Sequence, residues 1–480
     1  MSPTRIAVID IGKTNAKLAL VDAATLREIA VETRPNTVLP GPPWPHFDLD
    51  GHWKFLLDAL TRMQAEHGID AISVTTHGAA AVLLDKDGAL AAPMLDYEHT
   101  GPDEVAAAYD AIRPPFAETG SARLPMGLNL GAQLFWQLQD PDLDARVAHV
   151  VTYPQYWGFR LTGRFATDVT SLGCHTDLWN PWTGTPSSLV DHLRLTDRLA
   201  PAHHSSDVLG PVAPGIAART GLSPDTPVVC GIHDSNASLY PHLAGRDAPF
   251  SVVSTGTWVI AMAVGGAPVT LDPARDTLVN VNAHGGAVPS ARFMGGREYE
   301  ILRRPPPDPV PDAGGTPAGR MQVDVGTDAG QVRDAGGTGA GQMPDAGGTL
   351  FCLPAVEPGT GPFPGRTGGF TRKPKDESER MLAISRYLAL MTDTCLSLIG
   401  AEGPVIVEGP FARNTDYLQM LAALRGTVEA SESATGTSSG GALLLVEQYQ
   451  EQAGRAVTPS DPEALRAYAA AWNDLIGSAR

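Results

Sequence analysis

Short apolar runs that end in small polar residues recur along this chain, and each predicts a buried strand followed by a turn. The first pair of strands covers residues 5–11 and 17–22, with a glycine-containing turn over residues 12–16 between them. The pattern returns at Val228-Val229-Cys230 and again within residues 251–263. In α/β folds such polar turns at the carboxyl ends of strands lie where ligands bind.

Apolar residues at helical spacing predict helices between these strands. Residues 53–66 and 376–400 show the clearest apolar stripes, which we interpret as core faces. Residues 81–85 and 89–90 are predicted to pair as a hairpin. Shorter helices are predicted over residues 131–139, 156–161, 186–198 and 214–220, and further strands over residues 71–76 and 278–284 and within residues 403–408. The fold class is therefore α/β.

The composition permits packed cores and argues against one class of partner. At 480 residues the chain is long enough for two or three domains, and 43% of its residues are hydrophobic. We place the first domain at residues 1–248 and the second at residues 249–480, where a new strand pattern begins. A net charge of −18 argues against nucleic acid, which needs a basic surface.

One stretch breaks all periodicity. Residues 305–349 repeat Asp-Ala-Gly-Gly-Thr three times and carry few bulky apolar side chains. Such a tract cannot bury enough apolar surface to offset the conformational entropy of the chain. We interpret it as a disordered surface insertion in the second domain.

The sequence also predicts the cellular compartment of the protein. No signal peptide precedes the first strand, and no apolar run approaches the ~20 residues that span a bilayer. The four cysteines show no metal-ligand spacing and are expected to be reduced thiols. We therefore expect a cytoplasmic protein without a membrane partner. The sequence does not fix the oligomeric state and leaves a homodimer open.

Two carboxylates stand out as candidates for chemistry. Asp234 follows the strand that ends at Cys230, and Asp10 lies near the end of the first strand. Phosphoryl transfer uses an acid that takes a proton, an acid that holds Mg²⁺ and turns that bind phosphates. The two acids and the two turns rich in glycine and hydroxyls supply these groups. Asp234 is the candidate catalytic base and Asp10 the candidate metal ligand. The structural alternative for Asp234 is a helix N-cap.

The same stretches resemble the FGGY family of carbohydrate kinases, whose fold is shared with actin. Asp10-Ile11-Gly12-Lys13-Thr14-Asn15 resembles the first phosphate motif of the family, and Ser254-Thr255-Gly256-Thr257-Trp258 resembles the second. Gly231 to Ala237 resembles the catalytic segment. The resemblance covers residues 5 to about 260 and about 350 to 445. It implies two actin-like ATPase (ribonuclease H-like) domains around a central cleft.

The resemblance implies a set of contacts for each substrate. ATP phosphates would contact Gly12, Thr14, Asn15, Lys17, Thr255, Gly256 and Thr257; adenosine would contact Gly409, Asn414 and Gly440; and the sugar would contact His77, Glu98, His233 and Asp234. Pro410 and Phe411 depart from the adenosine motif of the family, and its Gly-Glu-Arg motif is missing. Pro410 and Phe411 replace small residues and would reshape the nucleotide pocket.

The implied activity is ATP-dependent phosphorylation of a ketose, with Mg²⁺ as cofactor. The His233-Asp234 pair together with Ser-Thr-Gly-Thr-Trp is most similar to the rhamnulokinase and fuculokinase branch, which favours a deoxyhexulose. A pentulose kinase acting on xylulose or ribulose is the alternative. A catalytically weak sugar- or nucleotide-binding protein is a third hypothesis, which ketose-dependent ATP turnover would distinguish from the other two.

Overall fold

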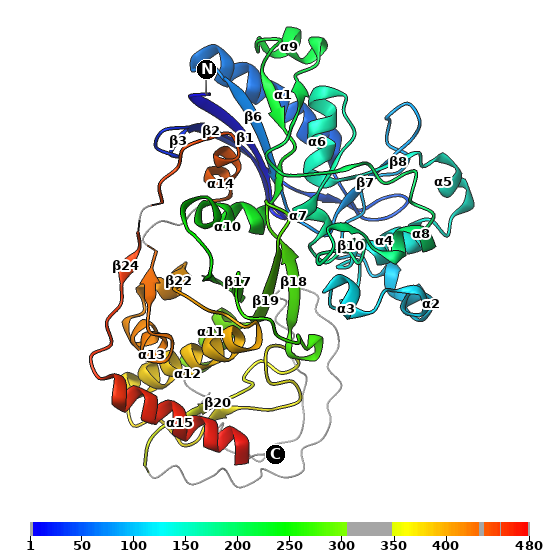
Figure 1. Cartoon of the computed structure of the whole chain (residues 1–480). Coiled ribbons are helices and arrows are strands. Elements are labelled where there is room, and N and C mark those ends of the chain that lie inside the picture. Colours follow the sequence, from blue (N-terminus) through cyan, green and yellow to red (C-terminus); the bar gives the residue numbers. More distant parts are fainter. Residues whose placement is uncertain (1–2, 305–347, 432–435, 452, 479–480) are drawn as a thin grey trace, which may run out of the picture.

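The computed structural model describes residues 3–304, 348–431, 436–451 and 453–478 of the chain. All but the last two residues of the low-complexity stretch at 305–349 lie outside the described residues. The described elements form two sheet-based halves, with helix α10 (Asp234–Gly245) between them (Figure 1).

The first sheet has seven strands, six of them in the order β13-β14-β6-β1-β2-β3, with β15 also pairing with β6. β1 runs antiparallel to β2 and parallel to β6. The bounds are β1 (Arg5–Ile11), β2 (Asn15–Asp22), β3 (Glu28–Pro35), β6 (Ala71–Thr76), β13 (Val208–Pro211), β14 (Pro227–Val229) and β15 (Ile232–His233). The strand prediction for residues 5–11 is confirmed, and β2 begins two residues earlier than predicted.

The second sheet also has seven strands, in the order β18-β19-β17-β16-β22-β23-β24. β16 runs antiparallel to β17 and parallel to β22, which repeats the arrangement of β1 with β2 and β6. The bounds are β16 (Phe250–Thr255), β17 (Val259–Val264), β18 (Thr277–Val281), β19 (Ala287–Phe293), β22 (Val405–Glu408), β23 (Val428–Ala430) and β24 (Arg455–Ala456).

The remaining elements are short strand pairs and helices. The strands are β4 (Val38–Leu39), β5 (His46–Phe47), β7 (Ala81–Leu84), β8 (His149–Thr152), β9 (Thr167–Asp168), β10 (Trp179–Asn180), β11 (Thr185–Pro186), β12 (Ala202–His203), β20 (Cys352–Leu353) and β21 (Gly369–Phe370). The other α-helices are α1 (Leu49–Glu66), α2 (Ala106–Ile112), α3 (Phe116–Thr119), α4 (Leu130–Gln137), α5 (Pro141–Arg146), α6 (Tyr153–Thr162), α7 (Val169–Leu172), α8 (Ser188–His192), α9 (Pro214–Thr220), α11 (Gly295–Arg303), α12 (Glu377–Leu398), α13 (Thr415–Arg425), α14 (Thr437–Leu443) and α15 (Pro462–Ser478). Short 3₁₀ helices are η1 (Gly101–Val105), η2 (Pro273–Arg275) and η3 (Pro410–Arg413).

Each sheet buries apolar side chains on both faces. Helices α1, α6 and α9 cover one face of the first sheet, while α12, α13 and α15 pack against the second sheet. α10 lies between the two sheets, since Leu239 packs against the second sheet and Ala237 packs against strands of the first. The helix that begins with Asp234 is therefore fixed from both sides.

Helix α14 joins the two halves, although it comes from the carboxyl-terminal part of the chain (Figure 1). It packs against β1 through Ala442 and against α10. A Cβ added at Gly440 would lie 1.7 Å from the carbonyl oxygen of Ala237, so glycine permits the close contact between α14 and α10. The domain boundary near residue 249 stays a prediction. By sequence α14 belongs to the second predicted domain, but it packs against the first sheet.

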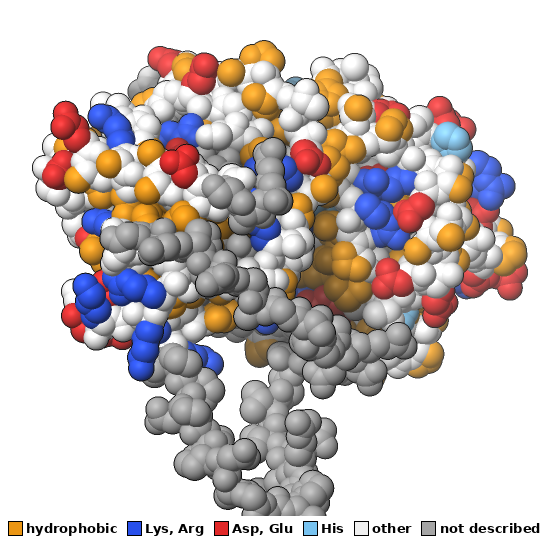
Figure 2. All heavy atoms as spheres, turned by 90° about the horizontal axis from the view of Figure 1, so that it is seen from below, with side chains coloured by type: hydrophobic (Ala, Val, Ile, Leu, Met, Phe, Trp, Pro, Cys, Tyr) orange, Lys and Arg blue, Asp and Glu red, His pale blue; other side chains and the backbone are white. Residues whose placement is uncertain are grey.

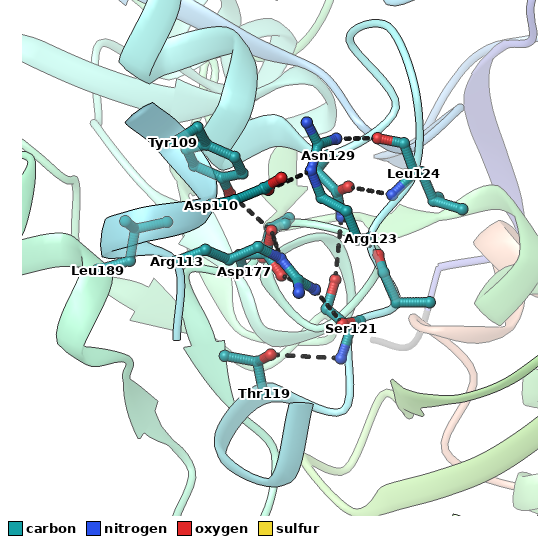
Figure 3. A network of polar contacts seen from close by, with 12 residues as sticks. Tyr109, Asp110, Arg113, Thr119, Ser121, Arg123, Leu124, Asn129, Asp177 and Leu189 are labelled. Atoms are coloured by element: carbon teal, nitrogen blue, oxygen red, sulfur yellow. Dashed lines mark hydrogen bonds and ion pairs between the residues drawn. The ribbon is translucent and has the colours of Figure 1, made fainter. Parts of the chain in front are cut away.

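A buried polar network fixes the loop after α7 (Figure 3). The guanidinium of Arg113 donates to both carboxylate oxygens of Asp177 at 2.9 Å, and the hydroxyl of Tyr109 donates to Asp177 at 2.6 Å. A carboxylate buried this deeply requires such charged and hydrogen-bonding partners. The network ties α2 to the loop that carries Cys174, three residues before Asp177.

Three sequence predictions fail or change in detail. The helix predicted over residues 186–198 is wrong in length, because only α8 (Ser188–His192) is helical and a turn follows it. β7 pairs mainly with β8, and the predicted hairpin is reduced to one bridge between Leu84 and Leu90. α1 begins four residues before the predicted start, because the Asp48 carboxylate accepts the backbone N–H of Gly51 and caps it.

Two surface properties bear on the predicted partners. Within the described ranges, no helix combines the length and the apolarity needed to cross a bilayer. On the face shown in Figure 2, basic side chains lie in separate groups beside acidic ones rather than in one continuous basic surface.

Candidate active site

The two candidate carboxylates lie at the carboxyl ends of two strands, β1 and β15, that both pair with β6. β1, β6 and β15 are parallel, and Thr75 of β6 is in register with Asp10 on one side and Ile232 on the other. Asp234 comes two residues after Ile232. The carboxyl ends of parallel strands meet at one edge of a sheet, where ligands bind in α/β folds. The strand pairing thus places both acids at this edge.

Asp234 is the first residue of α10, and its carboxylate is held through one oxygen. Oδ1 accepts the backbone N–H of Ser235 at 2.6 Å and lies 3.2 Å from Nε2 of His233. Oδ2 has no hydrogen bond within the described part of the chain. The side chain is 29% exposed. Oδ2 is therefore available to accept a proton from a ligand.

His233 is buried beside Asp234 and forms the N-cap position of α10. Burial lowers its pKa, but the neighbouring Cys174 thiolate and the Asp234 carboxylate outweigh this effect and raise the pKa to about 9. A protonated imidazole would donate a hydrogen bond to Asp234 Oδ1. His233 therefore orients the carboxylate and adds a positive charge next to it.

His77 lies in an aromatic cluster next to these residues. The centres of the Phe47, Tyr97 and Tyr153 rings lie 5.0–5.2 Å from its ring. Burial lowers the pKa of His77 to about 4, so the ring is neutral at pH 7. A Cβ added at Gly78 would lie 2.5 Å from Nε2 of His233, which shows how closely this loop approaches the catalytic segment. His77, His233 and Asp234 thus lie close together, and their contacts with a sugar stay predictions.

Asp10 is only 8% exposed and has partners from distant parts of the chain. Its Oδ2 accepts the hydroxyls of Thr437 and Ser438, the first two residues of α14, and lies 3.1 Å from Nζ of Lys17. Burial lowers the pKa of Lys17, but the charges of Asp10 and Glu28 raise it above its usual value. Oδ1 of Asp10 has no protein donor among the described residues.

The turn over residues 12–16, hereafter the first turn, is held by its backbone. The N–H of Gly12 donates to the carbonyl of Asn15 at 2.9 Å, and Asn36 bonds to the turn from both its backbone N–H and its side chain. The side chains of Thr14 and Asn15 are exposed. The turn can therefore meet a phosphate without rearranging its backbone.

Sequence reasoning missed one ion pair in the site. The ammonium of Lys13, in the middle of the first turn, forms a close ion pair with Asp96 and lies 3.1 Å from Oε2 of Glu98. Glu98 was predicted at the sugar, whereas Lys13 and Asp96 were not assigned any role. The only sequence signal for this ion pair was the position of Lys13 between Gly12 and Thr14. Its partners lie at least 83 residues away in the sequence, so no local pattern connects them to it.

The turn over residues 256–258, hereafter the second turn, is built from backbone and hydroxyls. Gly256 and Thr257 are exposed, and the N–H of Gly256 donates to the carbonyl of Trp258 at 2.9 Å. The hydroxyl of Thr255 is already used, because it donates to the carbonyl of Glu408 and accepts the N–H of Phe411. Thr255 thus joins β16 to the turn after β22.

The residues predicted at adenosine have structural partners of their own. Gly409 has φ +80°, and a Cβ there would lie 2.1 Å from the carbonyl oxygen of Thr255. Asn414 caps α13 through the N–H of Tyr417 and donates to Ser385. Gly440 packs on α10 instead of lining an open pocket wall. Their roles toward adenosine stay predictions.

A buried charge cluster connects α10 to the turn after β22. His242 of α10 bonds to Glu408 through Nε2 at 2.9 Å and to Glu451 through Nδ1 at 2.5 Å. Arg246 donates to Glu451 and Glu429. Burial lowers the pKa of His242, but the two carboxylates raise it to about 9. The helix that begins with Asp234 is thus bonded at its other end to the second half of the molecule.

Residues of both halves line one cavity of about 140 Å³. Ser235 and Ser238 of α10 face it from one side, and Ser254, Arg292 and Glu408 face it from the second sheet. Ser235 directly follows Asp234, so the amino end of α10 borders this cavity.

The donor set suits a cation that is held mainly by a substrate. The described residues contain no group of three or more His, Cys, Asp or Glu side chains arranged to hold a metal. Asp10 offers one open carboxylate oxygen, and Mg²⁺ is commonly held by one or two carboxylates plus phosphates and water. The site therefore fits Mg²⁺ that arrives with a nucleotide.

Comparison with known proteins agrees with this geometry. Residues 5–240 match the N-terminal domain of the FGGY family of carbohydrate kinases, and residues 247–321 and 345–454 match an FGGY C-terminal domain. A carbohydrate kinase from Novosphingobium aromaticivorans has a similar structure, with a TM-score of 0.85, 37% identity and 100% of both chains covered. The α/β fold with two actin-like ATPase halves is thereby confirmed.

Two curated relatives are more distant in sequence. The L-fuculokinase of Escherichia coli strain K12 is 27% identical over 273 residues, covering 54% of this chain and 56% of the relative. The rhamnulokinase of Klebsiella pneumoniae is 27% identical over 319 residues, covering 60% and 59%. The match thus spans little more than half the length of these curated relatives.

Proposed function

Because the chain belongs to the FGGY family of carbohydrate kinases, we propose that it transfers the γ-phosphate of ATP to a hydroxyl of a ketose sugar. The observation that carries this proposal is the position of Asp234. Its free carboxylate oxygen lies at the edge of the first sheet, at the start of a helix that lines a cavity shared with the second sheet. The enzyme class is a phosphotransferase with an alcohol group as acceptor.

Asp234 acts as the general base. A sugar hydroxyl is a poor nucleophile at neutral pH, so a carboxylate that takes its proton as the new bond forms speeds the attack. His233 holds Oδ1 and leaves Oδ2 for the substrate proton. His77 is neutral at pH 7, and its Nε2, which has no partner in the described structure, can bond to a sugar hydroxyl.

The phosphates bind between the two turns. Thr14, Asn15 and Lys17 beside the first turn and the backbone of Gly256 and Thr257 in the second turn would contact the β- and γ-phosphates. Asp10 would hold Mg²⁺ directly or through water. When bound, Mg²⁺ neutralises the charge that the phosphates carry in the transition state. Adenosine would lie near Gly409 and Asn414, which follow β22 of the second sheet, and near Gly440 of α14.

The substrate is a deoxyhexulose such as rhamnulose or fuculose. The His233-Asp234 pair, the second turn and the sequence relatives support this choice. A pentulose such as xylulose or ribulose is the alternative. A cytoplasmic location suits an enzyme that uses ATP.

Sugar binding closes the two halves over the site. The first domain, residues 1–248, carries Asp10, His77 and Asp234, while the second, residues 249–480, carries the second turn and the adenosine site. Water competes as a nucleophile, so alignment that waits for the sugar prevents wasteful hydrolysis. Small-angle scattering should show a smaller radius of gyration with sugar bound. An unchanged radius would overturn the proposed closure.

The test is ADP release against a panel of ketoses that includes L-rhamnulose, L-fuculose, D-xylulose and D-ribulose. We expect ATP turnover that depends on one deoxyhexulose. Preference for a pentulose would replace the substrate but keep the reaction. ATP turnover that no sugar increases would reject the kinase and favour the weak binding protein suggested by Pro410, Phe411 and the missing Gly-Glu-Arg motif.

A further inference from the structure

Lys13 belongs to the first turn by sequence but contacts the sugar side of the site. Its ammonium forms a close ion pair with Asp96, lies 3.1 Å from Glu98 and sits 4.4 Å from the centre of the Tyr97 ring. The Phe47 ring lies 5.2 Å away. Asp96, Tyr97 and Glu98 belong to the loop over residues 94–99, hereafter the sugar loop. Among the described residues, these contacts of the ammonium are with the sugar loop and with Phe47 beside it.

Lys17, the other lysine of this hairpin, has a different environment. Its Nζ lies 3.1 Å from Asp10 and 3.1 Å from Glu28. Lys17 therefore lies beside the candidate metal ligand, whereas Lys13 lies beside the sugar loop. Two cations four residues apart serve opposite sides of the reacting centre.

Both ends of the Lys13 link are fixed by backbone hydrogen bonds. The first turn is closed by Gly12 and Asn15, and Asn36 donates to the Gly12 carbonyl at 2.8 Å. On the other side, the N–H of Asp96 donates to the Pro45 carbonyl at 2.9 Å. The ion pair therefore connects two rigid segments and sets their separation.

The surroundings give this ion pair more weight than a surface pair. Asp96 is 6% exposed, and a carboxylate buried to this degree is destabilising without a cation. Lys86 and Asp87 form the contrasting case, because their side chains are 82% and 73% exposed and such pairs contribute little. Without Lys13, Asp96 and Glu98 would repel one another and the sugar loop would shift.

We propose that Lys13 is a positioning residue of the sugar site: it holds Asp96 and Glu98 where they accept hydrogen bonds from sugar hydroxyls, and it does not bind the ATP phosphates. The inference rests on the proposed kinase function and adds a specificity element to it. The first turn thereby contributes to both substrates, through Thr14, Asn15 and Lys17 to ATP and through Lys13 to the sugar.

The experiment compares Lys13→Met with Lys13→Arg, Lys17→Met and the surface control Lys86→Met. Charge-assisted hydrogen bonds of the kind that Lys13 supports correspond to roughly ten- to hundredfold in affinity, so Lys13→Met should raise the KM for the best ketose by that factor. Lys13→Arg should restore most of the loss, and Lys86→Met should match the wild type. The kcat at saturating ketose should fall much less than the KM rises.

Nucleotide binding gives the second readout, which needs no sugar turnover. Calorimetric titration with the non-hydrolysable analogue AMP-PNP and Mg²⁺ should give Lys13→Met a Kd within about threefold of the wild type, and Lys17→Met a Kd weaker by about tenfold or more. If Lys13→Met weakens AMP-PNP as Lys17→Met does, Lys13 binds phosphate and the proposal is overturned.

The remaining outcomes are equally decisive. A ketose KM unchanged in Lys13→Met also overturns the proposal. If Lys13→Met does not fold, Glu98→Gln tests the same loop from its exposed end and should raise the ketose KM without changing the Kd for AMP-PNP. If the wild type phosphorylates no ketose, the proposed function fails, whereas the AMP-PNP comparison still decides whether Lys13 serves the nucleotide.

Discussion

The two turns that face the proposed phosphate site occur in the same backbone arrangement but carry different chemistry. Each connects two antiparallel strands, and each leading strand pairs on its other side with a parallel strand. The first turn is surrounded by charges, namely Asp10, Lys13 and Lys17 with their partners. The second turn offers backbone groups and the hydroxyl of Thr257, while Thr255 is used in joining β16 to β22.

This difference indicates that the two halves contribute in different ways, the first through charged side chains and the second through backbone groups. The charged half positions a base, a cation and a sugar, and its side chains are sensitive to any loss of charge. The second half presents backbone N–H groups, which a side-chain substitution does not remove. Substitutions should therefore affect catalysis most in the first half, stability most at the contacts between the halves, and neither strongly in the second turn.

The largest effect is expected at the charged edge. Asp234→Asn removes the proposed base but keeps the size of the side chain and its contacts with Ser235 and His233. The kcat should fall by roughly 10²–10⁴ with nearly unchanged KM values, the usual contribution of a general base. Steady-state kinetics with the best ketose measure this. Retention of more than half of the wild-type rate would remove Asp234 from the mechanism.

The charge cluster between the halves should make stability depend on pH. The folded pKa of His242, about 9, lies above the ordinary value of about 6.5, so its contribution is fully present below pH 6.5 and is lost as the pH rises through 9. The shift corresponds to about 3 kcal/mol. The Tm difference between wild type and His242→Gln should be largest near pH 6 and shrink by pH 10. A difference that is constant with pH would contradict the assignment.

The contact between α14 and α10 should be sensitive to one methyl group. Gly440→Ala places a Cβ 1.7 Å from the Ala237 carbonyl, so the two helices must separate, at a cost of about 1–3 kcal/mol. Gly436→Ala, just before α14, serves as the control, because no atom of the described residues lies within 4 Å of the new Cβ. Thermal unfolding of both variants measures the difference. Equal Tm values would show that α14 can move freely.

The smallest effect is expected in the second turn. Thr257→Ala removes an exposed hydroxyl and leaves the backbone N–H groups in place, so the Tm should stay within about 1 °C and the KM for ATP should rise by about threefold to tenfold. Kinetics with ATP as the varied substrate check this. A loss of kcat comparable to that of Asp234→Asn would mean that the second turn, too, works through its side chains.

Much of the fold could be predicted from local pattern, because each element depends on its own residues. β1, β6 and α12 were found within two residues of their bounds, since their apolar spacing is continuous. α8 was predicted too long, because the apolar residues after His192 pack from a turn and not from a helix. The packing of α14 on the first sheet depends on tertiary contacts that no local pattern contains.

The site was predictable only as far as its motifs are contiguous. His233 and Asp234 are adjacent in sequence, and the strand register that brings Asp10 beside them follows from the fold. Thr437 reaches Asp10 across 427 residues, and no spacing rule connects the two. The pair between Lys13 and Asp96 was missed for the same reason.

The central claim is that the γ-phosphate of ATP leaves for a sugar hydroxyl at Asp234. Phosphorus NMR of wild-type protein with Mg²⁺, ATP and the best ketose measures where this phosphate goes. We expect a new phosphomonoester signal that grows together with ADP, and only slow release of inorganic phosphate when the ketose is left out. Inorganic phosphate released at the same rate with and without ketose, with no phosphomonoester, would contradict it.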